Sequence, residues 1–113
     1  MHEYSVASSL LDLVDQHARE HPGARVLRVH VRLGEHCGVE PDLLRTAWDL
    51  VRERSPAAGA ALEVAIVPLR WECRMCEKWL DPGTGPRCPA CGGPAAVASG
   101  LELWLDRTEL EVE

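Results

Sequence analysis

Phenylalanine is absent from this 113-residue chain, and aromatic residues are scarce overall, with one Tyr and four Trp. Few side chains are therefore available for stacking nucleic-acid bases, and the core must be built mainly from Leu, Val and Ala. Basic residues are outnumbered by acidic ones, which leaves a formal net charge of -6. Because sequence-independent binding of nucleic acid depends on Lys and Arg, this charge argues against a nucleic-acid partner.

Long apolar runs are also missing. No stretch approaches the ~20 residues that span a bilayer, and Glu3 stands where a secretory leader would carry positive charge. We therefore expect a cytoplasmic protein that does not associate with a membrane. Thiols are kept reduced in that compartment, so the five Cys are expected to bind metal or remain free rather than form disulfides.

The length and composition predict one folded domain of ordinary size with room for a small inserted module. Two stretches have the apolar spacing of amphipathic helices, one from Ser5 to His21 and one that begins near Pro41. The residues predicted to be buried are Val6, Leu10, Leu13, Val14 and Ala18 in the first helix and Leu44, Ala47, Trp48 and Val51 in the second.

Alternation with a period of two predicts three strands. The clearest is Arg25–Leu33, the second is Ala61–Val67, and a third pattern begins at Leu101 and continues less regularly to Val112. The last strand needs partners, so we expect it to rejoin the sheet made by the first two. The residues between the second and third strands would then form an insertion, with domain boundaries at 1–70 and 99–113 for the main domain and 71–98 for the inserted one.

The insertion carries two CxxC pairs separated by eleven residues, with Cys73 and Cys76 in the first and Cys88 and Cys91 in the second. Each pair lets a tight turn direct two sulfurs to one point, and two such turns form the tetrahedral four-sulfur site typical of structural zinc. Four thiolates also bind iron or an iron–sulfur cluster, which stays open as an alternative. Four protein ligands leave no position for a substrate, so the site is predicted to be structural.

The charges of the insertion are balanced, so it has no basic face for DNA or RNA. Trp71 and Trp79 are expected to pack against the small metal core or against the rest of the protein.

The sequence MHE at the start of the chain suggests a second metal site. The terminal amine of Met1 and the amide nitrogen and imidazole Nδ1 of His2 could surround one ion, with a fourth donor from the amide or carboxylate of Glu3. A planar set of nitrogen and oxygen donors suits Ni(II) or Cu(II) better than Zn(II).

The whole chain resembles the nickel metallochaperones of hydrogenase maturation, the HypA family with its HybF relatives. The shared motifs are the MHE start followed by SLLDLV, the strand VLRVHVRLGE, the boundary GVEP, the pair CxxC and CPxCG, and the terminal strand that ends in LEVE.

The resemblance implies an α+β fold with two helices, a three-stranded mixed sheet and a zinc-ribbon-like module inserted before the last strand. It implies that His2 binds nickel with help from the terminal amine and Glu3, and that the four cysteines hold structural zinc. It also implies no catalysis, a HypB-type GTPase as partner, transfer of the ion to the large subunit of a [NiFe] hydrogenase, and in some relatives service to urease maturation.

The loop GEHCGVEP departs from the family pattern at His36 and Cys37. We interpret Cys37 as a small buried side chain outside the nickel site, His17 and His21 as solvated residues near a helix end, and His30 as a polar residue on the wet side of its strand.

Two other functions are compatible with the residues alone. One is a zinc-ribbon adaptor for protein interactions without a role for nickel. The other is a metallohydrolase that uses His2 and Glu3, which is disfavoured because no nucleophile with an evident base accompanies them.

Overall fold

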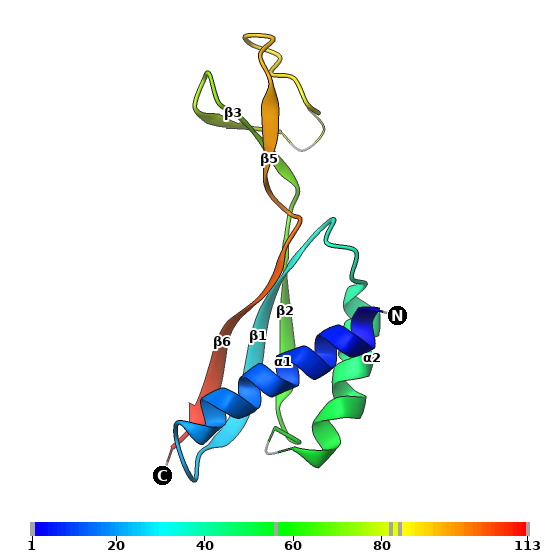
Figure 1. Cartoon of the computed structure of the whole chain (residues 1–113), viewed down its shortest axis with the longest axis vertical. Coiled ribbons are helices and arrows are strands. Elements are labelled where there is room, and N and C mark those ends of the chain that lie inside the picture. The colour runs from blue at the N-terminus through cyan, green and yellow to red at the C-terminus, as the bar shows by residue number, and fades with distance from the viewer. Residues whose placement is uncertain (1, 56, 82, 84, 113) are drawn as a thin grey trace. The chain divides into compact units, whose positions relative to one another are not determined.

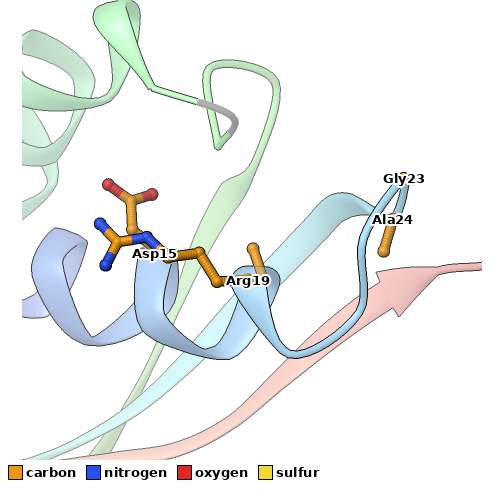
Figure 2. Close-up of a pocket in the computed structure, with 5 residues that line it drawn as sticks. Asp15, Arg19, Gly23 and Ala24 are labelled. Carbon is orange, nitrogen blue, oxygen red and sulfur yellow. The ribbon is translucent and has the colours of Figure 1, made fainter.

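The computed structural model describes residues 2–55, 57–81, 83 and 85–112, with the backbone alone for His2 and Arg54. Its elements, most of which are labelled in Figure 1, are α1 (His2–Arg19), β1 (Arg25–Gly34), α2 (Pro41–Val51), η1 (Arg52–Arg54), β2 (Ala61–Val67), β3 (Arg70–Cys73), β4 (Lys78–Leu80), β5 (Ala95–Ser99) and β6 (Leu103–Glu111).

The strands form two three-stranded sheets, one in the order β2-β1-β6 and one in the order β4-β3-β5. The first sheet is mixed, because β1 and β2 run in the same direction and β6 runs opposite to them (Figure 1). In the second sheet β3 pairs antiparallel with both neighbours. The predicted α+β fold, with two helices, a mixed sheet and a cysteine-bearing module before the last strand, is confirmed.

Contacts divide the chain into two compact units. The first unit comprises Met1–Arg32, Val39–Ala65 and Trp104–Glu113, and the second comprises Leu33–Gly38 and Ile66–Leu103.

The core of the first unit includes one face of each helix. The buried residues of α1 are Ala7, Leu10 and Val14, so the predicted burial of Leu13, which is 42% exposed, is wrong. These three positions follow one another at spacings of three and four, whereas Leu13 lies one residue from Val14 and therefore about 100° away around the helix.

In α2 the prediction of Leu44, Ala47 and Trp48 as core residues is confirmed. The indole Nε1–H of Trp48 donates to the carbonyl of Ala60 over 3.1 Å, which satisfies its polar group inside the core. The Arg52 guanidinium donates to the same carbonyl at 2.6 Å. These two bonds tie the end of α2 to the residue that precedes β2.

The polar face of the first sheet carries ion pairs between β1 and β6. Glu109 Oε2 lies 2.9 Å from His30 Nε2 and 3.3 Å from Arg28 Nη1. Flanking pairs join Arg25 to Glu111 at 2.9 Å and Arg32 to Asp106 at 3.5 Å. The polar position predicted for His30 is therefore correct, and its partner is a carboxylate of β6.

Two glycines in the second unit allow backbones to cross closely. A Cβ on Gly34 would lie 2.5 Å from the carbonyl carbon of Gly100, and one on Gly100 would lie 2.5 Å from the Cα of Leu69. Gly100 also has φ +99°, which L-residues rarely adopt. Glu35 forms hydrogen bonds to the segment next to this crossing. Its amide donates to the Val67 carbonyl, and its carboxylate accepts from the Leu69 amide.

Among the described residues, no helix combines the length and the apolar character that a membrane crossing requires.

Replacing Gly100 with Ala tests the close crossing. We expect Gly100→Ala to lower the free energy of unfolding by about 2 to 4 kcal/mol, because the new Cβ meets backbone and the positive φ is strained. Gly59→Ala is the matched control, because a Cβ there meets nothing within 4 Å. Urea unfolding of both variants checks the difference, and equal stabilities would contradict it.

Acid unfolding tests the role of Glu109. The His30 imidazole, and after it the Arg28 guanidinium, hold the pKa of Glu109 below its ordinary value of 4.5. The ionised Glu109 therefore stabilises the fold above about pH 4.5, and this contribution is lost as the pH falls through the lower folded-state pKa.

We expect Glu109→Gln to be less stable than the parent chain at pH 7 and to lose less stability on acidification. Glu111→Gln, which breaks only one exposed pair, is the control and should keep the parent's pH dependence. Urea unfolding between pH 3 and pH 7 measures both, and parallel pH profiles for Glu109→Gln and the parent would refute the assignment.

Candidate metal centre

The four cysteines predicted as ligands converge in the second unit. One sulfur from each lies within 4.8 Å of every other, and the Sγ–Sγ distances are 3.6 Å for Cys73–Cys91 and 4.0 Å for Cys76–Cys88. A tetrahedral ion with bonds of about 2.3 Å to sulfur separates its ligands by about 3.8 Å. The two Sγ–Sγ distances of 3.6 and 4.0 Å are therefore close to those expected around one ion bound by four thiolates.

The first cysteine pair is positioned by the turn between β3 and β4. Cys73 ends β3, and its carbonyl accepts the Glu77 amide at 2.8 Å. Glu77 has φ 54°, the left-handed conformation that closes this turn. The Cys76 amide donates to the Cys73 sulfur over 3.3 Å. A backbone N–H thus supports the negative charge that a bound thiolate carries.

The second pair repeats the backbone turn on a different segment, with a different amide bonded to sulfur. The Cys88 carbonyl accepts the Gly92 amide at 2.8 Å, and Gly92 has φ 70°. The Gly93 amide donates to the Cys91 sulfur over 3.3 Å. In the motif CPxCG a glycine occupies the left-handed position at no steric cost, whereas the first turn places Glu77 there.

The thiols influence one another's protonation. Backbone N–H groups of Cys91 and Ala90 lower the pKa of Cys88 to about 7. A hydrogen bond with the Cys73 sulfur is the largest cause that raises the pKa of Cys76, to about 12. Four thiolates cannot stay ionised at this separation without a compensating positive charge, so the arrangement favours a divalent cation.

The two tryptophans of this unit have different environments. Trp71 packs against the buried cluster of Cys73, Leu80 and Cys88, as expected. The packing predicted for Trp79 is wrong, because its side chain is 61% exposed. The Arg70 guanidinium lies 5.6 Å from the centre of its ring, which is a cation–π contact.

The predicted nickel ligands lie at the start of the first unit. Met1 lies outside the described residues, and of His2 the structure describes only the backbone, which begins α1. The Glu3 carboxylate Oε2 accepts the backbone N–H of Glu40 at 3.0 Å. Glu40 is the N-cap of α2 and its own carboxylate accepts the Asp42 amide at 3.4 Å. Glu3 therefore joins the starts of the two helices, a contact that the sequence did not indicate.

The remaining histidines and the fifth cysteine form no metal cluster in the described part of the chain, where the four cysteines are the one convergent group of three or more ligands. Cys37 is half-buried and His36 is exposed. His21 is exposed as expected, but His17 is half-buried and its Nδ1 lies 3.5 Å from Thr108 Oγ1.

Comparison with known proteins gives consistent results. A family model described as hydrogenase/urease nickel incorporation, metallochaperone, hypA matches residues 1–110. The hydrogenase maturation factor HypA of Wolinella succinogenes is 35% identical over 119 residues, which cover 100% of this chain and 98% of that protein.

Solved structures agree with this match. A solution structure of a HypA protein superposes with a TM-score of 0.80 at 30% identity and covers 100% of this chain and 98% of that chain. The solution structure of the Ni metallochaperone HypA from Helicobacter pylori superposes with a TM-score of 0.72 at 29% identity, with 98% of each chain covered.

Metal content tests the four-sulfur site. We expect Cys88→Ser to lose most of the roughly one equivalent of metal that a four-thiolate site holds, because three sulfurs cannot close the tetrahedron. Cys37→Ser is the matched control and should keep its metal, since Cys37 lies outside the cluster. Elemental analysis by plasma mass spectrometry after dialysis measures both, and equal metal contents would exclude this site.

Proposed function

This chain belongs to the HypA family of hydrogenase and urease nickel-incorporation metallochaperones, and we propose that it binds Ni(II) at its amino terminus and delivers the ion for the maturation of a [NiFe] hydrogenase. The observation that carries the proposal is the family match over residues 1–110, which includes both the MHE start and the four cysteines. The family is one of maturation factors, and we assign no catalytic residue.

We propose that nickel is bound by Met1, His2 and Glu3. The amine of Met1 and the amide and imidazole nitrogens of His2 form adjoining chelate rings around a planar ion, which suits Ni(II). Glu3 also positions the proposed site. Its contact with the Glu40 amide holds the first turn of α1 beside the start of α2. Each oxygen of a carboxylate can accept more than one bond, so the contact is compatible with a donor role.

We propose zinc as the ion of the four cysteines Cys73, Cys76, Cys88 and Cys91. Four thiolates in a closed tetrahedron are typical of structural zinc, and the separations of the sulfurs support that geometry. The ion would stabilise a unit whose own buried cluster is small. We retain 71–98 as the extent of the zinc domain, with 1–70 and 99–113 as the nickel domain.

A carrier must hold its ion and also release it to a recipient. Donors that all come from the first three residues suit this requirement, because one movement of a short segment removes several ligands together. The proposed partners are a HypB-type GTPase, the large subunit of a [NiFe] hydrogenase and, as in some relatives, urease maturation proteins. We propose that this transfer takes place in the cytoplasm, without a nucleic-acid or membrane partner.

The central experiment is a nickel titration of untagged protein that begins at Met1, followed by absorption spectroscopy. We expect a planar Ni(II) spectrum, and we expect His2→Ala to abolish it because the imidazole and the chelate ring that depends on it are lost. His21→Ala is the matched control, since His21 is an exposed histidine on the turn after α1. The affinity should also fall with acid, as protons compete for the amine and the imidazole.

Zinc content and the far-ultraviolet circular dichroism of His2→Ala should match those of the parent chain. An N-terminal extension that blocks the amine should act like His2→Ala. Unchanged nickel affinity in the extended protein would refute the proposed ligand set, and zinc binding without any nickel binding would favour an adaptor function.

A further inference from the structure

The four sulfur ligands of the cysteine cluster differ in how well the protein covers them. Cys73 and Cys88 are 0% and 2% exposed, Cys76 is half-buried and Cys91 is exposed. A metal-bound cysteine is a thiolate, which is the form that reacts with oxidants, so access decides which of the four reacts. Cys91 is therefore the sulfur that an oxidant from solvent meets first.

A glycine leaves the space beside this sulfur open. The Gly93 amide donates to the Cys91 Sγ at 3.3 Å, and a Cβ on Gly93 would lie 3.2 Å from that sulfur and 3.4 Å from the Cγ of Met75. The other cysteine of this pair is better protected, because Cys88 is buried and its sulfur accepts backbone N–H groups of Ala90 and Cys91. The second CxxC pair thus has one covered and one open sulfur.

A second thiolate lies within reach of Cys91. The Cys73 Sγ is 3.6 Å from the Cys91 Sγ, which is shorter than the 4.0 Å between the sulfurs of Cys76 and Cys88. A cysteine oxidised to a sulfenic acid condenses with a neighbouring thiol to form a disulfide. Cys73 ends β3 and is fully buried, so it meets an oxidised Cys91 from inside the cluster.

We propose that Cys91 is a reversible oxidation site for hydrogen peroxide and that Cys73 closes the resulting disulfide. First, the Cys91 thiolate attacks one peroxide oxygen, an S–O bond forms, the O–O bond breaks and hydroxide leaves. Next, the Cys73 thiolate attacks the Cys91 sulfur, an S–S bond forms, the S–O bond breaks and a second hydroxide leaves. The two thiolates together lose two electrons, and the peroxide becomes two waters after each hydroxide takes up a proton.

The disulfide dismantles the metal site. Only Cys76 and Cys88 remain as ligands, and two sulfurs do not complete the tetrahedron that holds zinc. The ion is released, and the small buried cluster around Cys73 and Leu80 loses the charge that stabilised it. A thiol reductant reverses the reaction by disulfide exchange. The inference rests on the proposed occupancy of the cluster by zinc and is independent of nickel binding at the amino terminus.

Limited oxidation of the zinc-loaded full chain tests the pairing. A substoichiometric amount of hydrogen peroxide is added, zinc release is followed with a colorimetric chelator, and the remaining thiols are blocked with N-ethylmaleimide. Trypsin cleaves after Arg74 and so places Cys73 and Cys76 on different peptides, whereas the peptide 88–107 contains both Cys88 and Cys91. Fragmentation of that peptide in a mass spectrometer shows which of its two cysteines is blocked.

We expect release of about one zinc ion for each disulfide formed, with the peptide 71–74 joined to the peptide 88–107 through Cys91. Reduction with dithiothreitol followed by added zinc should restore the original metal content. A first disulfide between any other two cysteines would overturn the proposal. Oxidation of the exposed Met75 before any zinc is released would overturn it as well, because the open sulfur would then not be the preferred target.

A variant of Gly93 tests the access of peroxide to Cys91. Gly93→Ala places a methyl group beside the Cys91 sulfur, and we expect it to slow zinc release by peroxide roughly threefold, since exposure governs oxidation. Gly83→Ala is the matched control, because a Cβ there meets nothing within 4 Å, and it should react at the parent rate. Equal rates in Gly93→Ala and the parent chain would contradict attack at Cys91.

Two controls separate this result from other causes. Zinc content and circular dichroism before oxidation confirm that each variant is loaded and folded, and the disulfide map of the parent chain tests the pairing even where a variant fails to load. Cys37→Ser should show the parent rate and the same disulfide, because Cys37 lies outside the cluster. A purified chain that binds no zinc would refute the proposed metal instead, before any oxidant is added.

Discussion

The cysteine-bearing part of the second unit has a very small apolar core. Its buried cluster consists of Cys73, Leu80 and Cys88, with Trp71 and two small neighbours packed against it. Two of the three buried residues are members of the four-sulfur group, so the segment folds around the position of a cation. The short strands and the two left-handed turns serve to direct four sulfurs to that position, and mutual repulsion of thiolates makes the arrangement depend on a bound charge.

The two metal sites of the proposal have opposite designs. The cysteine cluster uses four ligands from two turns that are each closed by backbone hydrogen bonds, which suits an ion that stays bound. The amino-terminal site uses consecutive donors at one chain end, which suits an ion that is transferred. One residue of the amino-terminal site is nevertheless tied to the rest of the fold. The bond from the Glu40 amide to Glu3 joins the first turn of α1 to the N-cap of α2.

The two edge strands of the first sheet, β6 and β2, differ in charge. On the β6 side, Glu109 lies between His30 and Arg28 and joins two strands through charge. On the β2 side the strand carries one carboxylate among its seven side chains. The two edge strands of the same sheet thus differ in the number of charged side chains that they carry.

The sequence by itself determined the elements that have strong periodicity and the site that has strong spacing. The Ala61–Val67 strand was predicted with its observed bounds, and the two CxxC pairs predicted the four ligands that converge, because both signals depend on local spacing. Tertiary contacts decided the rest. Whether Leu13 or Ala7 is buried depends on what packs against α1, and the exposure of Trp79 depends on which side of β4 faces the cluster. The contact between Glu3 and Glu40 joins residues far apart in the chain, and no local pattern encodes such a meeting.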